Sequence, residues 1–244
     1  MRVIVALLLA FSTTVALAEH GKQTWKNTHR SVIAVLPTWP GHEKPGFGAP
    51  RGVAPEGSGI SISLESKRNS DLVLTAAHVV DRATRVQIRD SDQGTLHDAE
   101  ILWIDRDADI ALLRTATFRP ALHLTTTTVT PGQHVCAIAN PFGLGVSISC
   151  GVVSGIHRVG IGFNPIEDFI QTDAAVNPGS SGGALVDENG VLVGMIAAIF
   201  TKEADIDAGV NFAISSRLLV ERIKQVAIPY FLTDRWCMLA PRLT

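Results

Sequence analysis

One serine, Ser181, stands in a glycine-rich turn, Gly179-Ser180-Ser181-Gly182-Gly183, between two apolar segments. Glycine adopts positive φ and has no Cβ, so the backbone amides of Gly179 to Ser181 can point together at one spot beside the Ser181 hydroxyl. Amides arranged in this way stabilise the negative oxygen of an acyl-transfer intermediate. An ordinary surface turn can have the same composition, so the turn alone does not decide between the two interpretations.

A serine hydroxyl is a poor nucleophile at neutral pH unless an imidazole takes its proton and a carboxylate orients that imidazole. His78 follows an apolar run that ends at Thr75, and Asp109 directly precedes the apolar run Ile110-Ala111-Leu112-Leu113. Both residues therefore stand at the ends of expected strands. The chain order His, Asp, Ser is that of the two-barrel serine proteases. The sequence predicts a triad of His78, Asp109 and Ser181.

The histidine and the aspartate each have a second interpretation. The chain has eight histidines, and a single histidine is commonly a surface or core residue. Asp109 could instead cap a turn or pair with Arg106 or Arg114. Two other acids, Asp105 and Asp107, stand nearby. We select Asp109 because it alone is followed at once by the apolar run.

Strand-like runs rich in Val, Ile and Leu, and ended by turn residues, occur along most of the chain. They fall into two sets, which favours antiparallel β-barrels or sandwiches over β-α-β units. The first set covers residues 31–36, 59–64, 72–75, 85–89, 100–104 and 110–114, and the second covers 134–139, 146–156, 169–172, 183–186, 191–199 and 209–214. Residues 215–226 alone have persuasive helical spacing, with a serine as the N-cap.

The N-terminus predicts a signal peptide over residues 1–18. Arg2 precedes an apolar run, and Ala16-Leu17-Ala18 forms a small-x-small cleavage site. An uncleaved membrane anchor is the alternative, which the short run and its Ser12-Thr13-Thr14 disfavour. We expect export to the periplasm or the exterior, with no membrane attachment of the mature form. Four further segments follow, namely the first barrel with its N-terminal segment (19–118), a connector (119–132), the second barrel (133–217), and a helix with a tail (218–244).

Composition excludes several classes of protein. Hydrophobic residues make up 46% and charged residues 18% of the chain, which allows a packed core and argues against general disorder. The net charge is −2 and basic clusters are absent from the sequence, so nothing favours nucleic acid as a partner.

Three cysteines, Cys136, Cys150 and Cys237, follow the signal peptide, and export permits pairing. Cys136 and Cys150 flank the segment 140–145, in two runs that resemble adjacent antiparallel strands, so we expect a disulfide between them. Two buried free thiols are the alternative. Cys237 is then left over, free or paired between molecules.

Five ordered motifs resemble the HtrA (Deg) branch of the chymotrypsin-like serine endopeptidases: residues 75–80, 109–113, 139–145, 172–185 and 209–214. The resemblance spans residues 30–217. It implies two antiparallel six-stranded β-barrels of the trypsin-like fold, and no metal or organic cofactor. It also implies that His78 is the general base, Asp109 its orienting carboxylate and Ser181 the nucleophile. The amides of Gly179 and Ser181, with Ser180 between them, would form the oxyanion hole.

The resemblance further implies how a polypeptide substrate binds. An unfolded segment would add as a strand beside residues 196–199. Ala175 stands six residues before Ser181, where trypsin-like members carry an acid, so we expect an uncharged pocket. A small or medium aliphatic side chain before the cleaved bond fits this pocket and the nearby residues Ile196, Ala197, Ala198 and Phe212. Core packing is the alternative role for Ile196 and Phe212.

Many HtrA members continue into PDZ domains, whereas too few residues follow the helix at 215–226, so we expect none here. HtrA cores are often homotrimers held by N-terminal residues; Trp25 could make that contact, or serve in the core or on the surface. The activity we expect is cleavage of unfolded or exposed polypeptides, in quality control or processing. The alternatives are a chaperone-like module that binds without cleaving, and a protease dedicated to one precursor.

Overall fold

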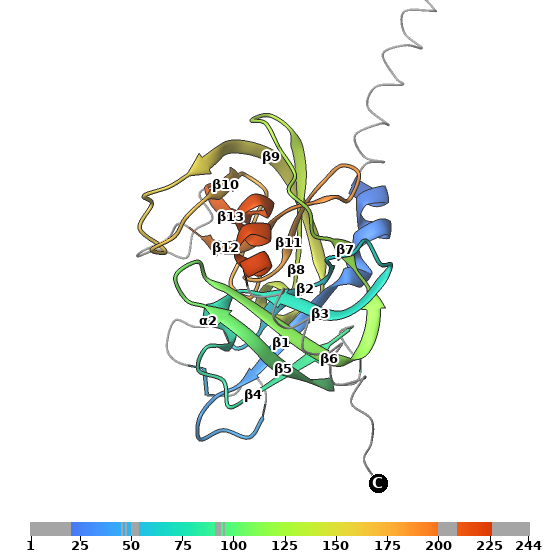
Figure 1. The fold of residues 1–244 in the computed structure, drawn as a ribbon, viewed down its shortest axis with the longest axis vertical. Coiled ribbons are helices and arrows are strands. Elements are labelled where there is room, and N and C mark those ends of the chain that lie inside the picture. The colour runs from blue at the N-terminus through green and yellow to red at the C-terminus, as the bar shows by residue number, and fades with distance from the viewer. Residues whose placement is uncertain are drawn as a thin grey trace, which may run out of the picture.

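The computed structural model describes residues 21–44, 46, 48–49, 54–90, 94, 96–199 and 209–225. The signal peptide expected at 1–18, residues 226–244 with Cys237, and the side chains of Ala198 and Ile199 lie outside this description. Two β-barrels make up the molecule, the first drawn in blue to green in the lower half of Figure 1 and the second in yellow to red in the upper half. None of the helices in the described ranges is long and apolar enough to cross a membrane.

The first barrel follows a helix at residues 21–28 and the 3-10 helix η1 (His29–Ser31). Its six strands are β1 (Val32–Thr38), β2 (Gly57–Ser63), β3 (Asn69–Thr75), β4 (Arg85–Arg89), β5 (Leu96–Asp105) and β6 (Ile110–Pro120). They are hydrogen-bonded in the order β1-β4-β5-β6-β3-β2, and antiparallel pairing of β1 with β2 closes the barrel. A short helix, α2 (Ala77–Val80), interrupts the chain between β3 and β4.

The second barrel is closed in the order β10-β13-β12-β11-β8-β9. Its strands are β8 (His134–Ala139), β9 (Ser147–Arg158), β10 (Phe169–Thr172), β11 (Ala184–Asp187), β12 (Leu192–Ile199) and β13 (Asn211–Ser215), with the 3-10 helix η2 (Pro141–Gly143) between β8 and β9. A helix over residues 216–225 follows. Ser215 Oγ accepts the amide of Leu218 at 3.2 Å, which is the N-cap that the sequence predicts.

Apolar residues from both barrels form one continuous core that reaches the last helix. Leu219 and Ile223, four residues apart, lie on the buried face of that helix. A separate cluster fills the interior of the second barrel, with Val135, Leu185 and Val193 fully buried. The Val-, Ile- and Leu-rich runs thus form the strands of both barrels, and the helical spacing of apolar residues docks the last helix on the core.

The two six-stranded barrels and the last helix confirm the fold predicted from the sequence. The connector expected at 119–132 begins later than predicted, because β6 continues to Pro120 and β7 (Leu122–His123) lies parallel to β2. Arg119 is 4% exposed, and its Nε donates to Asp90 at 2.9 Å. Pro120 does not prevent this pairing: it lies opposite Asn69 of β3, and the amide of the next residue, Ala121, donates to the carbonyl of Arg68 at 2.9 Å.

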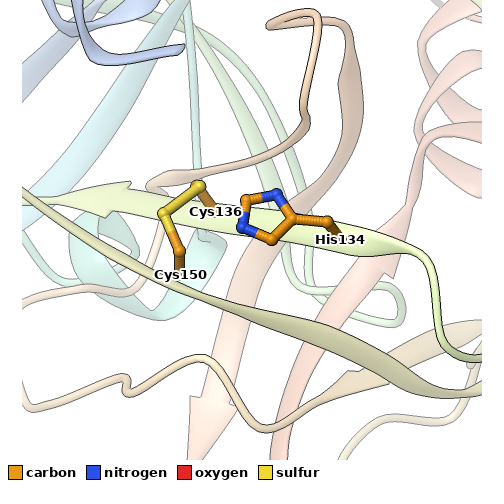
Figure 2. A group of neighbouring side chains, drawn as sticks. All are labelled: His134, Cys136 and Cys150. Carbon is orange, nitrogen blue, oxygen red and sulfur yellow. A yellow bond between two sulfur atoms is a disulfide. The ribbon is translucent and has the colours of Figure 1, made fainter. Parts of the chain in front are cut away.

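A disulfide joins β8 to β9. Cys136 lies directly opposite Cys150 in the antiparallel register, and their sulfur atoms are 2.11 Å apart. Figure 2 shows the bond with the ring of His134 beside it. These three side chains are the one group of metal-ligand type found in the described ranges. Because the bond uses both sulfurs, only the imidazole remains as a ligand, and a zinc site needs at least three.

Candidate active site

His78 projects from the start of helix α2. The preceding residues, Ala76 and Ala77, are buried, and the backbone of Ala76 is still extended (φ −73°, ψ 140°). Val79 and Val80 lie in the core, so the helix is held on one side. The His78 side chain is on the other side and is 49% exposed.

Asp109 is the last residue of the turn that joins β5 to β6. Its φ of 56° lies in the left-handed region, which aspartate adopts more readily than most residues. Its carbonyl accepts the amide of Ala77 at 3.2 Å, and its Oδ1 accepts the amide of His78 at 2.9 Å. The turn is therefore hydrogen-bonded to the beginning of α2.

The second carboxylate oxygen of Asp109 contacts the imidazole of His78, with Nδ1 2.8 Å from Oδ2. An ionised carboxylate only accepts hydrogen bonds, so Nδ1 carries the proton and Nε2 is left as an acceptor. Burial lowers the pKa of His78, but the hydrogen bond and the negative charge of Asp109 outweigh it and hold the pKa above its ordinary value of 6.5. This is the arrangement that a histidine general base requires.

The serine turn depends on two glycines with positive φ, Gly179 at 94° and Gly182 at 86°. A Cβ on Gly182 would lie 2.1 Å from the carbonyl oxygen of Ser58 and 3.1 Å from the amide nitrogen of Ala76. Only glycine fits there. The same closeness places Ser181, from the second barrel, beside the segment of the first barrel that leads to His78.

Two backbone amides of the turn are available as oxyanion donors. The amide of Phe142 donates to the carbonyl of Pro178 at 2.7 Å, and in a trans peptide the N–H of Gly179 then points the opposite way. Within the described residues, neither the Gly179 amide nor the Ser181 amide has a hydrogen-bond acceptor. The Ser180 amide donates to Asn177 at 2.9 Å and so is not available.

Ser58 on β2 was not identified from the sequence, although it orients the turn. Its Oγ donates to the carbonyl of Gly179 at 2.8 Å, and its amide donates to the carbonyl of Ser181 at 2.9 Å. The Oγ also accepts the amide of Asn140 at 2.8 Å. Ser58 is fully buried. Its position in Gly57-Ser58-Gly59 gives no signal of this role, which exists only once the two barrels have docked.

The hydroxyl of Ser181 donates to the carbonyl of Ala197 on β12 at 3.2 Å. Among the described residues it makes no hydrogen bond to His78, so of the predicted triad the structure has the His78–Asp109 contact and not the Ser181–His78 contact. Catalytic hydrogen bonds in unliganded enzymes often tighten only when substrate binds.

Of the residues predicted to bind substrate, Ala175 is exposed, and Ile196 and Ala197 contact the serine turn through their backbone. The side chains of Ile196 and Phe212 are buried. Ala175 is exposed on the loop before the serine turn, and Ala197 is held against Ser181 by its carbonyl. Ile196 contacts the turn through its backbone, with its carbonyl accepting the Gly182 amide at 2.7 Å. The side chains of Ile196 and Phe212 are 1% and 4% exposed. Phe212 packs edge-on against Phe163 at a centroid distance of 5.6 Å, as a core residue does.

The chain is similar to known proteases. Residues 57–195 match the family model described as a trypsin-like peptidase domain. The chain is 38% identical over 176 residues to the periplasmic serine endoprotease DegP of Escherichia coli (strain K12), which covers 70% of this chain and 35% of DegP. It is 38% identical over 168 residues to Protease Do-like 1, chloroplastic, of Arabidopsis thaliana, covering 66% and 37% of the two chains.

Among solved structures, the HtrA-type protease AlgW with tripeptide superposes with a TM-score of 0.72 at 32% identity, covering 84% of this chain and 62% of that chain. The chain spans about 35% of the length of DegP and a similar share of the other curated relatives.

The raised pKa of His78 gives a direct test of the aspartate's role. NMR titration of the His78 ring, assigned by its loss in His78→Gln, should give a midpoint above 6.5. Asp109→Asn should lower that midpoint, because burial remains while the charge that opposes it is removed. An equal midpoint in the wild type and in Asp109→Asn would show that this carboxylate does not act on His78.

Proposed function

The chain belongs to the trypsin-like peptidase family, in its HtrA-type branch of serine endoproteases, and from this premise we propose that it hydrolyses peptide bonds in unfolded or exposed polypeptides. One observation carries the proposal most strongly, namely the 2.8 Å contact between His78 Nδ1 and Asp109 Oδ2, which leaves Nε2 as a base. The compartment that we propose is the periplasm or the exterior, and the process is quality control or processing.

The proposed chemistry follows from the placement of the donors and acceptors. Ser181 Oγ attacks the substrate carbonyl while His78 Nε2 takes its proton, and the Nδ1–H bond to Asp109 stabilises the imidazolium that forms. The Gly179 and Ser181 amides donate to the oxyanion. His78 then gives its proton to the leaving amine, and a water activated by the same base hydrolyses the acyl-enzyme.

An extended polypeptide fits the free edge of β12. On one side this strand pairs with β11, but that pairing ends at Met195 opposite Ala184. On its other side, β12 pairs with β13 as far as Ile199. Residues 197–199 therefore have a strand on one side only within the described sheet. A substrate strand added to the open side would bring its carbonyl to Ser181, whose hydroxyl contacts Ala197.

We further propose that the residue before the cleaved bond is a small or medium aliphatic one. Ala175 supplies no charge to attract lysine or arginine. The neighbouring Ile196 and Phe212 are apolar and buried, so a charged side chain that reached them would lose its hydration without gaining a partner.

A second candidate function is a module that binds unfolded chains without cleaving them. The hydrogen bond of Ser181 to Ala197 rather than to His78 favours this candidate, since it describes a nucleophile that is not engaged with its base. A protease dedicated to one precursor is a narrower form of the first candidate.

The two functions separate in one experiment. Mature protein should degrade unfolded casein, whereas Ser181→Ala should reduce turnover by about 10⁴- to 10⁶-fold and leave the fold unchanged. Mass spectrometry of the products should show small or medium aliphatic residues at the new C-termini. If casein persists equally with both proteins, the binding module is the correct function; cleavage after lysine or arginine would contradict the pocket assignment.

We also propose a homotrimer that assembles through the helix at residues 21–28. Its Trp25 is partly buried and stacks on His29 at 4.7 Å. Trp25 also borders a surface hollow shared with Val146 and Ile148, and apolar residues of this kind are suited to a partner's contact.

Light scattering should give three times the monomer mass for mature protein. Trp25→Ala should shift the mass toward the monomer because it removes the largest apolar side chain of the hollow. Phe118→Ala, a control at a residue that is 71% exposed on β6, should remain a trimer. A monomeric wild type would contradict the assembly.

A further inference from the structure

We propose that Arg222 and Asp105 are positioning residues that hold the turn carrying Asp109 and, through it, the orientation of His78. The inference rests on the proposed peptidase site, because it concerns how that site is kept in its working geometry. Neither residue touches the triad histidine or serine in the described structure. The sequence presents Asp105 only as a competitor for the role of Asp109.

Asp105 ends β5, and residues 106–109 form the turn to β6. Asp105 Oδ1 accepts the amide of Asp107 at 3.1 Å and the amide of Ala108 at 3.2 Å. An aspartate that binds amides two and three residues ahead imposes a compact turn on its own backbone. Because Ala108 immediately precedes Asp109, these two hydrogen bonds fix the orientation of the backbone that leads into the left-handed conformation of Asp109.

Arg222 holds the other oxygen of Asp105. Its Nε lies 2.5 Å from Oδ2, and the two side chains are 24% and 5% exposed. Arg222 belongs to the helix at 216–225, which the buried Leu219 and Ile223 anchor in the core. The ion pair joins residues 117 apart in sequence, so it forms only after that helix has docked.

A second contact from the C-terminal half of the chain reaches the same turn. The amide of Ile166, in the loop between β9 and β10, donates to the carbonyl of Asp107 at 2.9 Å. The turn is therefore held at Asp105 by the last helix and at Asp107 by this loop. Asp109 itself is hydrogen-bonded to α2 in the described structure: its carbonyl accepts the amide of Ala77, and its two carboxylate oxygens contact the amide and the ring of His78.

The position of the carboxylate therefore depends on how rigidly the turn is held. Without Arg222, Asp105 keeps a buried charge with no counter-ion, and its side chain gains by turning toward water and releasing the two turn amides. A carboxylate displaced by about 1 Å can cost on the order of 100-fold in rate, although substrate binding at Ser181 is unaffected. The expected signature is a loss of kcat with KM preserved.

Arg222→Gln tests the inference on the mature protein. We expect kcat for a casein-derived fluorogenic peptide to fall by about 10- to 100-fold with KM within about twofold, and the midpoint of the His78 NMR titration to fall toward 6.5 or below. Arg222→Lys keeps the charge but lacks the planar fork of donors, so it should restore part of both values. If Arg222→Gln does not fold, Arg222→Lys against the wild type makes the same comparison.

Arg85→Gln is the matched control. It breaks the ion pair between Arg85 and Asp98, which lies on the first barrel and in which the two side chains are 54% and 65% exposed. It should leave kcat and the His78 midpoint unchanged. The inference is overturned if Arg222→Gln keeps the His78 midpoint and the kcat of Arg85→Gln. Should the wild type cleave nothing, the peptidase proposal falls, but the His78 titration still decides the positioning role.

Discussion

The contact between strand β2 and the serine turn is the constraint on which the site depends. His78 and Asp109 belong to one barrel and Ser181 to the other, so no local sequence feature can align them. Ser58 binds the carbonyls on both sides of Ser180, and Gly182 lies so close to Ser58 that no Cβ fits between them. Buried hydrogen bonds of this kind tolerate little displacement, since an unpaired carbonyl would cost about 1–3 kcal/mol. The docking of the barrels therefore brings Ser181, the proposed nucleophile, to the part of the first barrel that leads to His78.

Residues with left-handed backbone conformation occur where the chain turns sharply at this site. Gly179 and Gly182 bracket the nucleophile, and Asp109 has the same sign of φ. The glycines adopt it at no steric cost, whereas Asp109 is held there by neighbours, with its own carboxylate on His78 and Asp105 on the turn behind it. Asp109 is thus a residue with a strained backbone that its neighbours stabilise, as is often found at functional sites. The last helix contributes to that stabilisation through Arg222.

Much of this organisation could be predicted from the sequence, because the signals are local. Val, Ile and Leu runs between turn residues gave the strands, and the chain order of three polar residues gave the candidate triad. Ser58, Arg222 and the Phe142–Pro178 bond could not be found in the same way, because each depends on a partner far along the chain. The part of β6 beyond Arg114 was also missed, because a proline such as Pro120 is usually a sign that a strand has ended.

The central claim is that His78 activates Ser181. The most direct measurement is the mass of the mature protein after treatment with a fluorophosphonate, which phosphonylates a serine that has an adjacent base. The account predicts one adduct, located by peptide mapping on Ser181, whose formation slows by orders of magnitude in His78→Ala. Failure of the wild type to label, or labelling of Ser181 at the same rate without His78, would contradict it.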